Sequence, residues 1–174
     1  MEKKHKIDSI TQLSFSAIHP RGITKMTMPP SEFMIEGFID AREHVSQDFP
    51  DCFFGVDWVS FRLTAPNKVD SIRITGDYLP EYLTDFFESR VLASQPYWRY
   101  VDHTNRGPIT IRMPVFILNE TEKCVDGAPK ELLALRAAVI RLYKKASLRI
   151  PNLEAVQESK NVVMLGQLCL CPIY

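Results

Sequence analysis

Aromatic side chains are dense between residues 78 and 100, and an amide side chain lies among them. The aromatic residues are Tyr78, Tyr82, Phe86, Phe87, Tyr97, Trp98 and Tyr100. Tyrosine is a costly core residue unless its hydroxyl finds a hydrogen-bond partner. An apolar segment that carries tyrosine hydroxyls and the carboxamide of Gln95 has the composition of a small-molecule pocket. The same side chains could instead simply fill a core, which is the usual role of aromatic residues.

His103 is the other residue whose neighbours suggest chemistry, because Asp102 precedes it. A carboxylate that orients a histidine makes a general base. Adjacent side chains on a turn rarely face each other, so we interpret His103 as a polar loop residue before residues 105–108. The sequence holds no H-x-x-x-H pair, no glycine-rich phosphate loop and no G-x-S-x-G motif. We therefore expect neither an enzyme nor a metal or cofactor site.

Length and charge indicate one globular domain that does not bind nucleic acid by itself. The chain has 174 residues, of which 45% are hydrophobic and 24% charged. Lys and Arg number 21, as do Asp and Glu, and the net charge is zero. Phosphate binding usually needs an excess of basic residues on one face. The run Lys3, Lys4, His5, Lys6 is too short for that and reads as a solvated tail.

The cysteines and the N-terminus suggest a reducing setting. Cys52, Cys124, Cys169 and Cys171 form no C-x-x-C pair. In a strand, Cys169 and Cys171 would share a face and behave as small hydrophobes. The N-terminus is polar, and no stretch reaches the roughly 18 apolar residues of a membrane span. We expect a cytoplasmic protein without a membrane partner.

Hydrophobic periodicity predicts helices and strands in mixed order. Residues 1–30 form an N-terminal extension, and residues 31–174 form a single α+β domain. The expected fold is an α-β-α sandwich with a central antiparallel sheet of about five strands. The predicted helices cover 32–47, the segment from Pro80 and 130–145; the predicted strands cover 56–63, 69–75, 109–118, 147–150 and 162–171.

Two finer expectations follow from residue types. The helix over 130–145 should bury a face made of Leu132, Leu135, Val139 and Leu142. Pro114 should place its strand at a sheet edge or a bulge, because proline cannot donate a ladder hydrogen bond.

Several segments together resemble the autoinducer-binding domain of LuxR-type quorum-sensing regulators. The strand at 55–61, a second strand, and then Tyr78-Leu79-Pro80-Glu81-Tyr82 follow the family pattern. Tyr78 matches the family's Tyr, Tyr82 falls on its Trp, and Gln95-Pro96 falls on its Asp-Pro. Phe86 falls where the family often has a pocket aromatic. Residues 148–151 and 163–168 resemble the later strands, and the order of elements agrees over about residues 30 to 172.

The resemblance implies a ligand-sensing and dimerisation domain of a transcription regulator. It implies a small apolar signal, a homodimer, and DNA contact only through a helix-turn-helix module that this chain does not contain. The implied ligand-contacting residues are Tyr78, Tyr82, Phe86, Gln95 and Ile111. Gln95 is an uncharged acceptor where the family has a carboxylate, which weakens a ligand hydrogen bond by about 1 kcal/mol. We therefore expect ordinary acyl-homoserine lactones to bind weakly or not at all.

Two other functions fit the same residues. One is a protein-interaction or antagonist domain whose aromatic segment is only core. The other is a hydrolase or transferase with dispersed catalytic residues. A closed cavity beside Tyr78 and Gln95 favours the sensor, a filled core there favours the interaction protein, and a cleft with a perturbed carboxylate favours the enzyme.

Overall fold

The two alternating segments in the middle of the chain form an antiparallel hairpin, as predicted. In the computed structural model, β2 (Phe53–Thr64) pairs with β3 (Lys68–Thr75). The structure describes residues 13–17, 28–36, 49–65, 67–100, 107–120, 124, 128–149 and 155–170. Asp102 and His103 lie outside these ranges, as do residues 37–47 of the helix that we predicted over 32–47.

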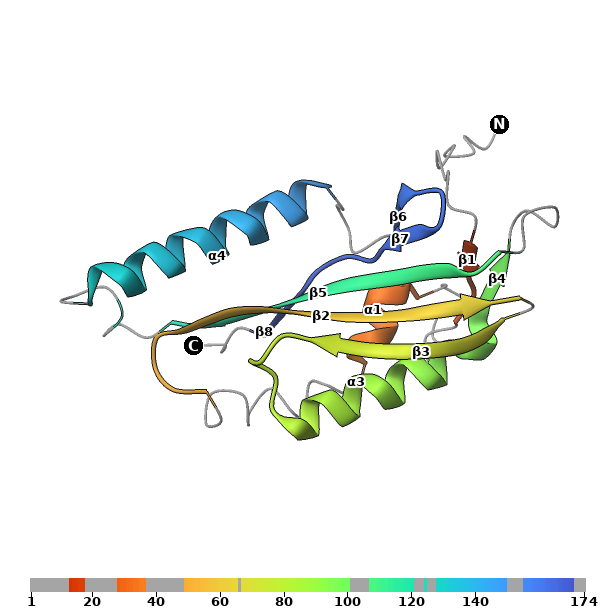
Figure 1. The fold of residues 1–174 in the computed structure, drawn as a ribbon, viewed down its shortest axis with the longest axis horizontal. Coiled ribbons are helices and arrows are strands. Elements are labelled where there is room, and N and C mark those ends of the chain that lie inside the picture. Colours follow the sequence, from red (N-terminus) through yellow and green to blue (C-terminus); the bar gives the residue numbers. More distant parts are fainter. Residues whose placement is uncertain are drawn as a thin grey trace, which may run out of the picture.

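Figure 1 shows the other helices and strands in chain order, which ends with three successive strands after the last helix. The helices are α1 (Pro30–Ile35), α3 (Glu81–Ser94), the 3-10 turn η1 (Gln95–Tyr97) and α4 (Lys130–Arg149). The other strands are β1 (Leu13–Phe15), β4 (Trp98–Tyr100), β5 (Ile109–Asn119), β6 (Val156–Ser159), β7 (Val162–Met164) and β8 (Leu168–Leu170).

The main sheet has six strands and is mixed. Its order is β3-β2-β5-β7-β6, and β8 also pairs with β5. β2 is antiparallel to β5, whereas β7 and β8 are parallel to β5. The α+β class is therefore confirmed, and the purely antiparallel sheet is corrected by two parallel pairings. Those pairings arise because α4 carries the chain back along the sheet before β6 to β8 form.

A second, two-stranded sheet joins the start of the chain to the end of the aromatic segment. β1 pairs with β4, with Leu13 opposite Tyr100 and Phe15 opposite Trp98. Leu13 is buried in the main core. The predicted N-terminal extension thus contributes a strand to the fold, which its mixed sequence did not reveal.

Pro114 lies in the central strand β5, not at the edge or bulge that we predicted. Along this side of β5, β7 pairs with residues 110–112 and β8 pairs with residues 115–117. Pro114 falls between the two partners, where the ladder is interrupted. A residue without an N–H is tolerated at that position because no neighbouring strand needs its donor.

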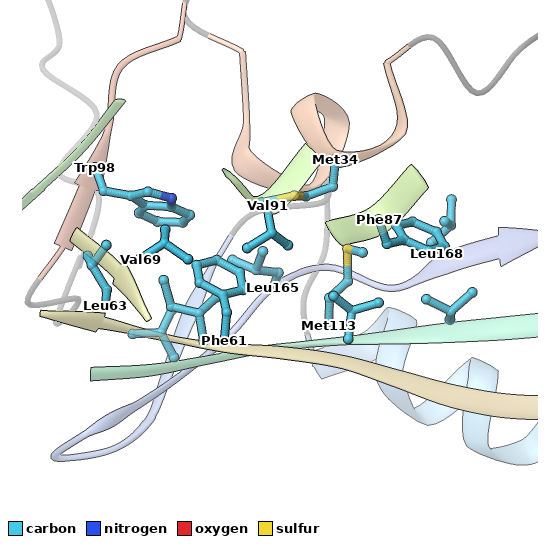
Figure 2. Close-up of a cluster of buried hydrophobic side chains, with 14 of the residues drawn as sticks. Met34, Phe61, Leu63, Val69, Phe87, Val91, Trp98, Met113, Leu165 and Leu168 are labelled. Atoms are coloured by element: carbon cyan, nitrogen blue, oxygen red, sulfur yellow. The ribbon is translucent and has the colours of Figure 1, made fainter. Parts of the chain in front are cut away.

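The sheet face toward α3 holds the main hydrophobic core (Figure 2). Inward residues of β2 and β5 meet the buried face of α3. Phe61, Ile111 and Met113 from the sheet, and Phe87 and Val91 from α3, are each at most 2% exposed. Burying a side chain of this size contributes about 1.5–3 kcal/mol. The space between α3 and the sheet is therefore filled by tightly packed side chains.

Arg90 ties α1 to α3 on this same side. Its guanidinium donates to the carbonyl oxygen of Phe33 in the last turn of α1, with Nε at 3.0 Å. Its carbon Cζ lies 4.2 Å from the centre of the Phe33 ring. A cation at the C-terminal end of a helix satisfies carbonyls that have no partner within the helix.

Helix α4 covers part of the opposite face of the sheet (Figure 1). The sequence predicted this helix, but it extends to Arg149, so the strand predicted over 147–150 is wrong. Val139 is buried against the sheet at 4% exposed, as predicted. Leu135 and Leu142 are 43% and 53% exposed, so the predicted buried face is wrong for these two. They lie two turns apart on one flank of α4, which is less covered than the position of Val139.

A disulfide closes one end of the sheet. Cys52, just before β2, is bonded to Cys124, after β5, with a Cα–Cα distance of 5.2 Å. Cys169 is disulfide-bonded as well. The expectation that Cys169 acts as an unpaired small hydrophobe is therefore wrong. The sequence did not indicate that Cys52 pairs with Cys124, because 72 positions separate them.

Candidate functional site

The structure places Tyr78 and Tyr82 at the N-terminal end of α3, where both are exposed. Their exposed fractions are 40% and 41%. The ring of Tyr78 lies directly over Gly55, where an added Cβ would come within 2.7 Å of the ring. Its ring also makes an edge contact with Phe53, with ring centres 5.6 Å apart. Tyr78 therefore packs on the surface of the β2 backbone.

Phe86 and Ile111 belong to the packing on the α3 side of the sheet. Phe86 is half-buried and meets the ring of Phe87 edge-on, with centres 5.5 Å apart. Ile111 is fully buried in the main core. Both side chains are in contact with the core residues themselves.

Gln95 lies at the opposite end of α3 from the two tyrosines. Its Oε1 accepts a hydrogen bond from the backbone N–H of Val69, at 2.9 Å. The carboxamide thus accepts a backbone hydrogen bond from the beginning of β3. Because α3 has 14 residues, its length is about 21 Å. The structure does not bring Gln95 together with Tyr78 and Tyr82 around one small ligand.

Asp57 fixes the turn that leads into α3. Its Oδ2 accepts the backbone N–H groups of Tyr78 at 3.1 Å and Leu79 at 2.8 Å. Burial raises the pKa of Asp57, and the two backbone hydrogen bonds offset part of that rise. Gly76 has a φ of +128°, and a Cβ there would lie 1.6 Å from Asp57 Oδ1. Through Oδ2, this carboxylate holds the backbone of the turn in place.

A groove between α4 and the sheet is the best candidate for a binding site. Its volume is about 300 Å³. The floor comes from alternate residues of β2 and β5 that point away from the main core, and α4 forms the wall. The groove is lined by Val56, Trp58, Pro114, Phe116, Leu142, Lys145, Ala146, Met164 and Gln167.

The lining is largely apolar and partly open to solvent. Leu142 forms the open rim and is half exposed, whereas Phe116 on the floor is 2% exposed. The ring of Phe116 also meets Tyr143 of α4 edge-on, with centres 5.3 Å apart. A concave, mostly apolar site of this volume with a few polar groups matches small-molecule pockets.

Gln167 connects the sheet to α4 at one side of the groove. Its Nε2 donates to Ser147 Oγ at 2.6 Å, and Ser147 Oγ donates to the Tyr143 carbonyl at 3.0 Å. Gln167 Oε1 is buried and has no hydrogen-bond partner among the described residues. A buried acceptor without a donor is costly. A ligand with an N–H or O–H group would satisfy it.

Two cationic side chains lie beside the groove. Lys145 is part of its lining. Arg112 lies on the same face of the sheet, with its Cζ 4.5 Å from the centre of the Trp58 ring. This stacking holds Arg112 over one of the lining residues. Lys145 is the one ionisable side chain among the lining residues, so the arrangement supports binding more directly than acid–base catalysis.

The sequence carried a signal for this groove that the resemblance to the LuxR family obscured. Val56, Trp58 and Phe116 alternate with the residues of the main core, so this part of β2 and β5 carries apolar side chains on both faces. A strand that is apolar on both faces needs a covering layer on each side. The exposed leucines of α4 then mark where that cover is incomplete.

Comparison of the chain with protein-family models, with curated proteins and with solved structures found no match. Among the described helices, none is long and apolar enough to cross a membrane. Within the described ranges, no three His, Cys, Asp or Glu residues come together as a metal site. The candidate site thus depends on the geometry of the groove alone.

Proposed function

We propose that this domain is a sensor that binds a small, largely apolar molecule in the groove between α4 and the sheet. The observation that supports this most is a concave apolar site of about 300 Å³ with a buried acceptor, Gln167 Oε1, that has no partner among the described residues. Ligand sensing is also what the resemblance to LuxR-type regulators implies. The proposal is for binding, not catalysis.

The proposed ligand position differs from the one implied by the LuxR resemblance. Tyr78, Tyr82, Phe86, Gln95 and Ile111 are associated with α3 or with the core on that side of the sheet. Their polar groups are exposed or satisfied by backbone, and the apolar side chains among them pack on one another. The α4 side offers a site without rearranging this core. Acyl-homoserine lactones are therefore still expected to bind weakly.

A pair of variants on one flank of α4 tests the proposal. Leu142→Trp should fill the groove, because Leu142 lines it and is half exposed. Leu135→Trp is the matched control. Leu135 lies two turns earlier with a similar exposure and is not part of the lining. Thermal unfolding is followed with neutral alkanols and acyl-homoserine lactones of increasing chain length.

A neutral alkanol at a hundred times its dissociation constant should stabilise the wild type by about 2.7 kcal/mol. Leu135→Trp should keep this gain, and Leu142→Trp should lose it. Equal stabilisation of both variants would place the ligand elsewhere. If no member of the panel stabilises the wild type, the alternative of a protein-interaction domain without a small ligand takes its place.

We extend the proposal to a homodimer, which the resemblance to LuxR-type sensors also implies. The chain has zero net charge, which does not oppose self-association. Sedimentation equilibrium at micromolar concentrations should show a dimer. A monomer throughout that range would remove dimerisation from the proposal and leave the groove untouched.

A further inference from the structure

We infer that the ligand of the groove is an amphipathic anion: an alkyl or acyl chain with a carboxylate head and with a hydroxyl or amide N–H group that can donate to Gln167 Oε1. This inference depends on the proposed function and specifies its ligand. The chain would occupy the apolar floor, and the head would lie at the open rim beside Lys145.

The helix that forms the wall of the groove carries an excess of basic residues. Helix α4 contains six Lys and Arg residues and one Glu, although the chain as a whole is neutral. Arg136 of α4 pairs with Glu120. Lys145 in the lining forms no ion pair with another described residue. A negative head at the rim therefore meets an attractive field.

The sheet side of the groove adds to this preference. Arg112 stacks on Trp58, so the face of that indole already holds a cation. A cationic ligand would be repelled by both Arg112 and Lys145, and a second cation–π contact on the same face of Trp58 is blocked. No residue of the lining is acidic. The site therefore discriminates against positively charged amphiphiles.

The volume sets the length of the apolar part. About 300 Å³ is the space of roughly ten water-sized groups. A chain of about eight to ten carbons would fill it. Each methylene that enters the groove should raise affinity about fourfold. Chains that extend past the rim should gain little more, because the added carbons remain in water.

Adjacent lysines of α4 provide a matched test. Lys145 lines the groove, whereas Lys144 is exposed on α4 and does not line it. Lys145→Glu and Lys144→Glu make the same change in net charge. Decanoate, decanol and decylammonium are titrated into the wild type and both variants at neutral pH, and dissociation constants are measured calorimetrically.

The wild type should bind decanoate about two- to fivefold more tightly than decanol, and decylammonium most weakly. Lys145→Glu should weaken decanoate on the order of tenfold and reverse the order of decanoate and decylammonium. It should leave decanol nearly unchanged, which also shows that the variant is folded. Lys144→Glu should keep the wild-type order.

Three outcomes would overturn the inference. They are equal binding of decanoate and decanol by the wild type, tighter binding of decylammonium, or equal effects of the two lysine variants. In each case decanol still binds and Leu142→Trp still blocks it, so the proposed function survives. If none of the three probes binds the wild type, both the inference and the proposed function are wrong.

Discussion

The bond between Cys52 and Cys124 should provide a large part of the stability of this domain. Cys52 precedes β2 and Cys124 follows β5. These strands are antiparallel neighbours, with Phe53 opposite Asn119 at the same end. The folded sheet already holds the two ends together, so the bond acts mainly by restricting the unfolded chain.

The sequence separation gives the magnitude. A bond that closes a loop across 72 positions removes unfolded-state entropy equivalent to about 4 kcal/mol at room temperature. For a domain of this size, each kcal/mol corresponds to about 2–4 °C in melting temperature. The double variant Cys52→Ser/Cys124→Ser should therefore melt about 8–16 °C below the wild type.

Urea unfolding followed by circular dichroism measures the effect. The single variants and the double variant should each lose about the same free energy, because losing either cysteine breaks the bond. The slope of free energy against urea should increase in all three, since the unfolded chain without the bond exposes more surface. Reductant should destabilise the wild type more than the double variant.

Two results would refute this reasoning. The first is labelling of Cys52 or Cys124 by a thiol reagent in unfolded, unreduced protein. The second is additive losses from the two single variants, which would show that each cysteine acts through its own packing. Labelling should be measured without added reductant, because reductant would break the bond and expose both thiols. Disulfides persist under oxidising conditions.

Three further predictions concern residues that hold the chain in place. Gly76→Ala should cost about 2–4 kcal/mol in urea unfolding, because φ is +128° and a Cβ would overlap Asp57; Thr75→Ala is the control. Asp57→Asn should gain stability relative to the wild type in thermal melts as pH rises from about 4 to 7. Burial raises the pKa of Asp57, so the folded state favours the protonated carboxyl and the wild type loses stability as pH rises through that pKa. Asn119→Ala should cost about 2 kcal/mol by urea unfolding, because the buried Nδ2 donates to two backbone carbonyls at 2.8 and 2.9 Å; losing under about 0.5 kcal/mol would contradict this.

Local patterns predicted the elements that depend on local residues. The β2–β3 hairpin follows from period-two alternation, and α4 follows from its leucines and the preceding Pro129. The bulge at Ser71, where φ is +57°, could not be predicted, because serine rarely adopts that conformation. Ser147 was assigned to a strand although its hydroxyl bonds the carbonyl one turn earlier in α4.

The site was harder to predict because it depends on how far one helix covers the sheet. The density of aromatic residues pointed to α3, where tertiary packing turned most of them into core. Trp98 shows this: it is 1% exposed, and its Nε1 donates to Ser94 Oγ at 3.0 Å. A tyrosine or tryptophan whose polar atom finds a protein partner needs no ligand. Sequence composition cannot tell this case from a pocket.

The two faces of the sheet differ in what a ligand could add. On the α3 side, Phe61 and Phe87 are already buried, and a ligand would have to displace contacts that exist. On the α4 side, Leu142 is half exposed and Gln167 Oε1 has no partner among the described residues. A molecule bound there covers apolar surface and satisfies the acceptor in the folded state only. Such binding stabilises the domain by an amount that rises with the logarithm of ligand concentration, and this link between stability and ligand concentration is the physical requirement for a sensor.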